Sequence, residues 1–205
     1  MDENRRTAVR GQFVALCTSY APAFRKMERM KEAGAEFDAL VASGRFPSIA
    51  VFHDSLLCGT HMVYMQDANA SWHRIGQYML EIKRDGFYAF NQTHQVGGYN
   101  GPHIDKAGSI CVTAGKEEVM LSIKSGKLAD ALHQVECMIW HTNPGLTGQY
   151  SGANVIAWPL ATEGEVTCLQ RAKLSGQALL PAPSSVPVPP AATSRGFWRG
   201  LVRRT

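Results

Sequence analysis

One segment of the chain combines an imidazole, a carboxylate and a thiol. It reads Asn100-Gly-Pro-His-Ile-Asp-Lys-Ala-Gly-Ser-Ile-Cys-Val-Thr113 and carries His103, Asp105 and Cys111. Gly108 allows the backbone to reverse between the imidazole and the thiol. A thiolate is a strong nucleophile, and a nearby histidine favours its formation. The segment therefore predicts a nucleophilic cysteine, and the alternative is a buried structural cysteine next to a loop histidine.

Two other kinds of site could use the same thiol. A zinc site built from His94, His103 and Cys111 has no recognised ligand spacing, and the H-x-E with P-C-x-x-C pattern of zinc deaminases is absent. A cysteine-protease site would need a further histidine and an orienting group near the thiol. His94, His133 and His141 are available, but no spacing places them there. We therefore expect neither a metal nor an organic cofactor.

The five cysteines are not arranged as a framework. Cys17, Cys58, Cys111, Cys137 and Cys168 are odd in number, and no two of them stand at C-x-x-C spacing. This argues against both paired disulfides and a structural zinc site. No run approaches the ~18 apolar residues of a membrane span, and the first apolar run is too short for a signal peptide. We therefore expect a cytoplasmic location.

Length and charge limit the classes of function. The chain has 205 residues, a mass of 22.4 kDa, 45% hydrophobic and 19% charged residues, as expected for one globular domain with appendages. No acid follows Glu165, whereas six bases do, so residues 1–165 hold 15 bases and 17 acids for a net charge of −2. The basic balance belongs to the tail, and the body is not expected to bind nucleic acid.

Apolar periodicity divides the chain into helices and strands. Helices are expected over residues 7–20, 22–43 and 127–141, with a short final helix over 161–175. Strands are expected over 47–52, 61–65, 74–83 and 87–90, the last two joined by a turn at Arg84-Asp-Gly86. Residues 92–115 lose all periodicity, and residues 154–159 form a last strand or a docked segment.

The segment around Cys111 resembles the active site of ubiquitin-conjugating enzymes. In that family a His-Pro-Asn-Ile run is followed, after a short spacer, by Gly-x-Ile-Cys. Here Gly101-Pro102-His103-Ile104 occupies the position of the first run and Gly108-Ser109-Ile110-Cys111 that of the second. Gly101 replaces the family's histidine and His103 its asparagine. The resemblance covers residues 47–145 and is closest to divergent, prokaryotic-type members.

The resemblance implies a fold and an activity. The fold would be α+β, an antiparallel β-meander with the N-terminal helices on one side and the 127–141 helix on the other. Cys111 would receive the C-terminal carboxylate of a ubiquitin-like modifier from an activating enzyme, as a thioester, and pass it to an amine or thiol. His103 would support the loop or the oxyanion, and Asp105 would orient an incoming lysine. The alternative is a non-catalytic binding module of the same fold, with a structural Cys111.

The C-terminal part has a different composition. Residues 181–194 are rich in proline, which predicts a disordered linker, and the last eleven residues, 195–205, combine aromatic, aliphatic and arginine side chains. We expect this tail to bind a protein partner rather than a membrane. The alternative is a tail that only increases solubility. The expected partner-binding residues are Phe197, Trp198, Arg199 and Leu201. The chain would thus comprise a helical segment over 1–46, a ubiquitin-conjugating-like domain over 47–175, and a linker with its tail over 176–205.

Overall fold

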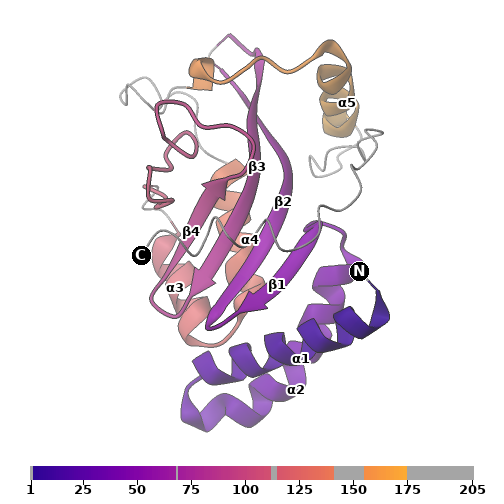
Figure 1. Ribbon diagram of the computed structural model, residues 1–205, viewed down its shortest axis with the longest axis vertical. Coiled ribbons are helices and arrows are strands. Elements are labelled where there is room, and N and C mark those ends of the chain that lie inside the picture. Colours follow the sequence, from indigo (N-terminus) through magenta and orange to yellow (C-terminus); the bar gives the residue numbers. More distant parts are fainter. Residues whose placement is uncertain (1, 68, 112–114, 141–154, 175–205) are drawn as a thin grey trace.

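The computed structural model describes residues 2–67, 69–111, 115–140 and 155–174 (Figure 1). Four strands form one sheet in which each strand pairs antiparallel with the next along the chain. They are β1 (Ser48–Phe52), β2 (Ser55–Gln66), β3 (Trp72–Lys83) and β4 (Gly86–Asn91). The predicted α+β class and antiparallel meander are therefore confirmed.

The strands follow the expected alternation on one face of the sheet. In β3, Tyr78, Leu80 and Ile82 are buried in the core, and their partners in β4 include Phe87 and Ala89. Strand β2 begins six residues earlier than its apolar pattern predicts. Its first residues include an unbroken buried run, Ser55 to Cys58, so alternation between the two faces is absent there.

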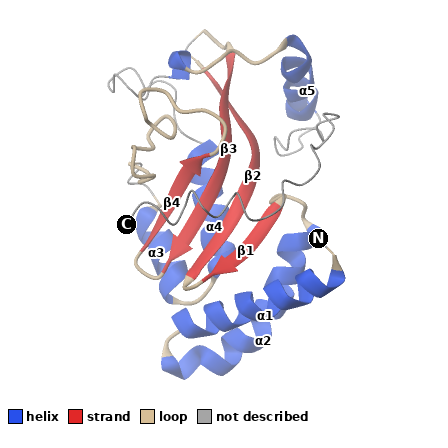
Figure 2. Cartoon of the chain, in the orientation of Figure 1, coloured by secondary structure: helices blue, strands red, loops and turns tan. Residues whose placement is uncertain are grey.

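Helices and connecting loops make up the rest of the described chain (Figure 2). They are α1 (Glu3–Tyr20), α2 (Lys26–Ala42), α3 (Lys116–Lys124), α4 (Leu128–Trp140) and α5 (Glu163–Leu174), with short 3₁₀ turns at Ala23–Arg25 and Val155–Ala157. Helix α3 was not predicted. Its signals were two acids in the first turn, Glu117 and Glu118, and apolar Val119 and Ile123 one turn apart.

The N-terminal helices and α4 share one core. Phe13 of α1, Phe37 of α2, Leu132 of α4 and Leu80 of β3 belong to a single buried cluster, in which the two phenyl rings lie 5.5 Å apart. The expectation that these helices flank opposite sides of the sheet is wrong. Figure 1 shows α4 behind the sheet and α1 and α2 across one of its ends. The apolar stripes of α1, α2 and α4 are all buried together, so one side of the sheet carries the core.

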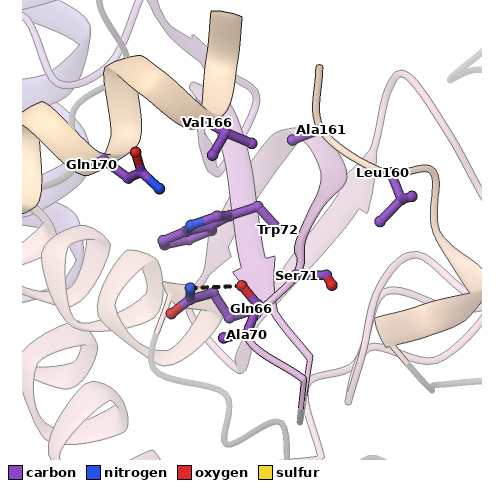
Figure 3. A pocket seen from close by; sticks show the side chains of 8 residues that line it. All are labelled: Gln66, Ala70, Ser71, Trp72, Leu160, Ala161, Val166 and Gln170. Carbon is purple, nitrogen blue, oxygen red and sulfur yellow. Dashed lines mark hydrogen bonds between the residues drawn. The ribbon is translucent and has the colours of Figure 1, made fainter. Parts of the chain in front are cut away.

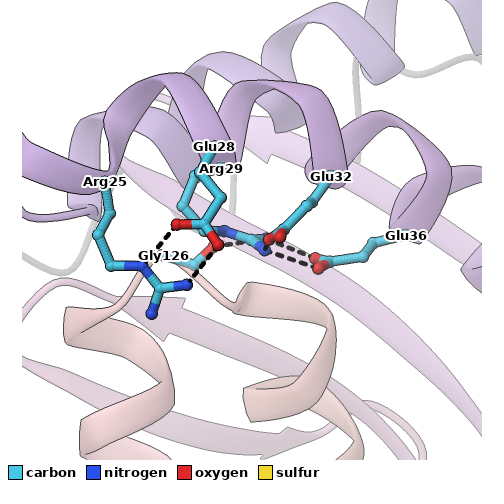
Figure 4. A network of polar contacts seen from close by, with 6 residues as sticks. All are labelled: Arg25, Glu28, Arg29, Glu32, Glu36 and Gly126. Carbon is cyan, nitrogen blue, oxygen red and sulfur yellow. Dashed lines mark hydrogen bonds and ion pairs between the residues drawn. The ribbon is translucent and has the colours of Figure 1, made fainter.

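A buried ion network joins α2 to the turn before α4 (Figure 4). Arg29 is 0% exposed, and its guanidinium donates to both carboxylate oxygens of Glu36, at 2.6 and 2.8 Å. It also donates to Glu32 and, at 3.2 Å, to the backbone carbonyl of Gly126. The N-terminal helices thus pack directly on the sheet domain.

The predicted linker and tail, with Phe197, Trp198, Arg199 and Leu201, lie outside the described residues.

Candidate functional site

A tight turn after β4 sets the position of His103. Gly101 and Ile104 form an antiparallel bridge, with the Ile104 N–H donating to the Gly101 carbonyl at 3.0 Å. Pro102 takes the second position of the turn and His103, with φ 62°, the third, which is the pattern of a type II turn. A side chain held at positive φ costs about 1 kcal/mol or more, so the turn holds strain at this histidine.

A second reversal brings the chain back to the thiol. Ile104 bridges to Ile110, and the Asp105 N–H donates to the Ser109 carbonyl at 3.0 Å. Carboxylate atom Oδ1 of Asp105 accepts from the N–H groups of Ala107 and Ser109, each at 2.8 Å. This carboxylate therefore builds the turn, a role that the sequence pattern did not predict. Its expected part in orienting a lysine stays a prediction.

These two turns place the imidazole beside the thiol. The Cys111 N–H donates to the His103 carbonyl at 2.8 Å, and His103 Nδ1 lies 3.3 Å from Cys111 Sγ. Residues eight positions apart thus become cross-strand neighbours. Cys111 is exposed, whereas His103 is only 8% exposed. The sulfur is therefore open to solvent, and the imidazole supports it from the inner side.

Burial favours the neutral form of both groups of the pair. Partial burial raises the pKa of the Cys111 thiol, and Asp105 adds to this, while the backbone N–H of Cys111 and the charge of Lys116 oppose it. Burial lowers the pKa of His103. A neutral imidazole with its proton on Nε2 can accept a proton at Nδ1. The geometry thus provides a base within reach of the thiol proton, rather than a preformed thiolate.

Packing explains why a glycine stands at position 101. A Cβ atom at Gly101 would lie 2.2 Å from the hydroxyl oxygen of Tyr78 and 3.2 Å from Ile104 Cδ1. Tyr78 is a core residue of β3 and is 1% exposed. The tyrosine therefore fills the space that a side chain at position 101 would need, and the loop lies directly on the sheet.

Two buried asparagines, missed in the sequence, lie beneath the loop. Asn91 ends β4 and is 7% exposed, and Asn100 precedes the first turn and is 1% exposed. Their amides bond to the backbone of β3 and of the loop that carries His103 and Cys111 (the thiol loop, residues 101–111). The available signal was their position, since they bracket a glycine-containing segment without periodicity, where buried backbone groups need side-chain partners.

A shallow groove borders the thiol loop. It has a volume of about 200 Å³ and is lined by residues of the β3–β4 turn, the thiol loop and α3. Its lining residues are Asp85, Gly86, Phe87, Tyr88, Ser109, Ile110, Lys116 and Met120. Ser109 and Ile110 immediately precede Cys111, so the groove lies next to the site in sequence, although Cys111 itself does not line it.

A larger hollow lies elsewhere (Figure 3). It has a volume of about 480 Å³ and is lined by Trp72, Gln66, Gln170 and neighbouring residues where the β2–β3 hairpin meets α5. The thiol loop is held on β4, by the Ala89 N–H and the Gly108 carbonyl at 2.9 Å. Ala89 pairs with Leu80, eight residues from Trp72 along β3, so the two features are separated by roughly 26 Å of strand. The hollow is not part of the cysteine site.

No group of three or more potential metal ligands occurs within the part of the chain that the structure describes. Nor is any of its helices both long and apolar enough to cross a membrane. Comparison with known proteins gives no match to any family model, curated protein or solved structure.

Proposed function

We propose that this chain carries a ubiquitin-like modifier as a thioester on Cys111 and transfers the acyl group to an amine or a thiol. The observation that carries the proposal is the exposed sulfur with His103 Nδ1 at 3.3 Å, on a loop fixed by two turns. Among the described cysteines, Cys17 and Cys58 are buried, which leaves no path for a large acyl donor. The proposed partners are the modifier and its activating enzyme.

The two steps balance with the residues present. In the first, His103 Nδ1 accepts the Cys111 proton while the sulfur attacks the carbonyl carbon of the activated modifier; the C–S bond forms, and the activating enzyme leaves with its electron pair as a thiolate. In the second, an amine attacks the same carbon, an amide forms, and the C–S bond breaks so that Cys111 leaves as a thiolate. The imidazolium returns its proton to this sulfur. The proton that the amine loses passes to solvent and balances the one that the thiolate of the activating enzyme takes up.

A second candidate is a binding module in which Cys111 forms no thioester. The observation that favours it is Gly101, which stands where the resembled family has a histidine in its active-site loop. The close packing of Gly101 on Tyr78 shows that this loop is braced by a different contact. The two candidates differ in a single measurable property, which is covalent loading.

Loading distinguishes them directly. The protein is incubated with a ubiquitin-like modifier, the activating enzyme of that modifier and ATP, and the product is separated without reductant. We expect an adduct that dithiothreitol removes, that is absent in Cys111→Ala and that is retained in Cys137→Ser and Cys168→Ser, which are matched exposed controls. Binding of the modifier with no adduct would favour the binding module.

A further inference from the structure

Both polar atoms of the Asn100 side-chain amide form hydrogen bonds beneath the thiol loop. Its oxygen accepts from the Asn91 N–H at 3.0 Å and from Gln95 Nε2 at 2.8 Å. Its nitrogen donates to the carbonyls of Asp105, at 2.8 Å, and Lys106, at 3.4 Å. Those two carbonyls belong to the reversal between His103 and Cys111. One buried amide therefore holds the end of β4 and the tip of the thiol loop together.

Asn91 extends this connection into the sheet. Its nitrogen donates to the Ile75 carbonyl of β3 at 2.7 Å and to the Asn100 carbonyl at 3.0 Å. Its oxygen accepts from the N–H groups of Thr93 and His94 at 3.0 and 2.9 Å. Buried amides with every polar atom bonded are rigid, because breaking any one bond leaves a desolvated group unpaired.

The side-chain amide of Asn91 packs against Gly76 of β3, where the strand has no side chain. A Cβ atom at Gly76 would lie 2.2 Å from Asn91 Oδ1, and Gly76 has φ 147°. The pairing of β2 with β3 is irregular next to it, where the register shifts between Val63 and Tyr64. The bulge in the strand and the glycine thus accommodate a polar side chain that an ordinary strand residue would exclude.

We propose that Asn100 is a positioning residue for the Cys111–His103 pair, holding the thiol loop on β3 and β4 through Asn91. Its consequence for acyl transfer rests on the proposed function, whereas its effect on the thiol does not. Both amides are neutral, so they fix the loop without placing a charge beside the sulfur. The expected effect of their loss is a loop that no longer holds the imidazole at the thiol.

The test measures Cys111 rather than stability alone. Iodoacetamide labelling is followed at each cysteine by peptide mass spectrometry from pH 6 to pH 11, for wild type, Asn100→Ala and Gln95→Ala. Gln95 is exposed and bonds to the same amide, so it is the matched control. Burial raises the pKa of the Cys111 thiol in the native loop. In Asn100→Ala we therefore expect the labelling midpoint to shift down, toward that of the urea-unfolded chain, and to stay unchanged in Gln95→Ala.

A structural role alone would lower the unfolding midpoint of Asn100→Ala and leave the labelling midpoint of its folded fraction unmoved, and this result would overturn the proposal. Should Asn100→Ala not fold, Asn100→Ser, which keeps a smaller acceptor, is measured in its place. The double variant with His103→Asn gives a further check, because effects that act through one pair are not additive. A wild-type protein that never loads a modifier, with the midpoint shift intact, would refute the proposed function and retain the role of Asn100.

Discussion

Two of the buried polar networks in the described part of the molecule differ in charge. Arg29 is an ion surrounded by Glu32, Glu36 and the Gly126 carbonyl, and it joins α2 to the turn before α4. The network under the thiol loop is centred on the neutral amides of Asn91 and Asn100 and includes backbone groups and the Thr93 hydroxyl. The first connects rigid helices, and the second holds an irregular loop.

The difference follows from what each network lies beside. A buried guanidinium needs carboxylates, and together they create a strong local field. Next to the helices this field affects no proposed chemistry. Next to Cys111, a charge would shift the thiol pKa strongly, since nearby charges are among the main causes of such shifts. Neutral amides satisfy the buried carbonyls of the loop and add no charge to those of Asp105 and Lys116, which already act on the pKa of the Cys111 thiol.

Removal of Arg29 is expected to have the largest effect on stability. Arg29→Ala leaves Glu36, which is 27% exposed, facing an emptied core position, and we expect a loss of about 3 kcal/mol in the free energy of unfolding by urea. Labelling of Cys111 should be unchanged below the transition. Arg25→Ala, which breaks only the exposed pair with Glu28, is the control and should leave the urea midpoint unmoved.

The second-largest loss of stability is expected at Gly101, in the thiol loop. Gly101→Ala forces a methyl group against Tyr78, and we expect it to cost about 2 kcal/mol, within the range of overpacked cores. Tyr78→Phe removes the oxygen that lies 2.2 Å from the added carbon. The double variant should therefore be more stable than the sum of the single losses predicts, measured as a double-mutant cycle in urea. Strict additivity would show that the tyrosine does not occupy this space.

A smaller loss is expected at the loop tip. Asp105→Ala removes the acceptor of two backbone N–H groups and should cost about 1 kcal/mol. Asp105→Asn keeps a carbonyl oxygen at the same position and should restore both the stability and the rate of acyl transfer. If Asp105→Asn instead restores stability but not transfer to lysine, the charge orients the acceptor, as the family resemblance implies.

The smallest effect is a pH dependence at His103. Because burial lowers the pKa of His103, the unfolded chain binds more protons at this residue below its ordinary pKa of about 6.5. The stability that this residue contributes is present above that pH and is lost as the pH falls through the folded pKa. Between pH 7.5 and pH 5.5, wild type should therefore lose more stability than His103→Asn, whose side chain suits a positive φ. An equal loss in both proteins would contradict the assignment.

Much of the scaffold could be predicted from the sequence. Tyr78, Leu80 and Ile82 alternate along β3, and the stripe on α4 gives its buried face, because local periodicity determines both. The shared side of the helices could not be predicted, since it depends on contacts between segments far apart in the chain, such as the common apolar core and the bond from Arg29 to a carbonyl 97 residues away. The start of β2 was missed because burial on both faces removes the alternating pattern.

The candidate site, too, could be predicted from the sequence only in part. Spacing and residue type led to Cys111 and His103, because the cross-strand geometry follows from a glycine turn between them. The asparagines gave no comparable pattern, since their bonds reach β3, the loop and each other only after folding. The turn-building carboxylate of Asp105 was assigned a chemical role alone, because an Asx turn and a free carboxylate look alike in a sequence.

Single-turnover discharge tests the account most directly. Wild-type protein is loaded with the modifier, ATP is removed, and lysine is added while the acylated residue is identified by peptide mass spectrometry. The account predicts a thioester on Cys111 alone, whose loss equals the amide formed, and slower discharge in His103→Asn at unchanged fold. An adduct on Cys137 or Cys168, or no thioester at all in a protein that binds the modifier, would contradict it.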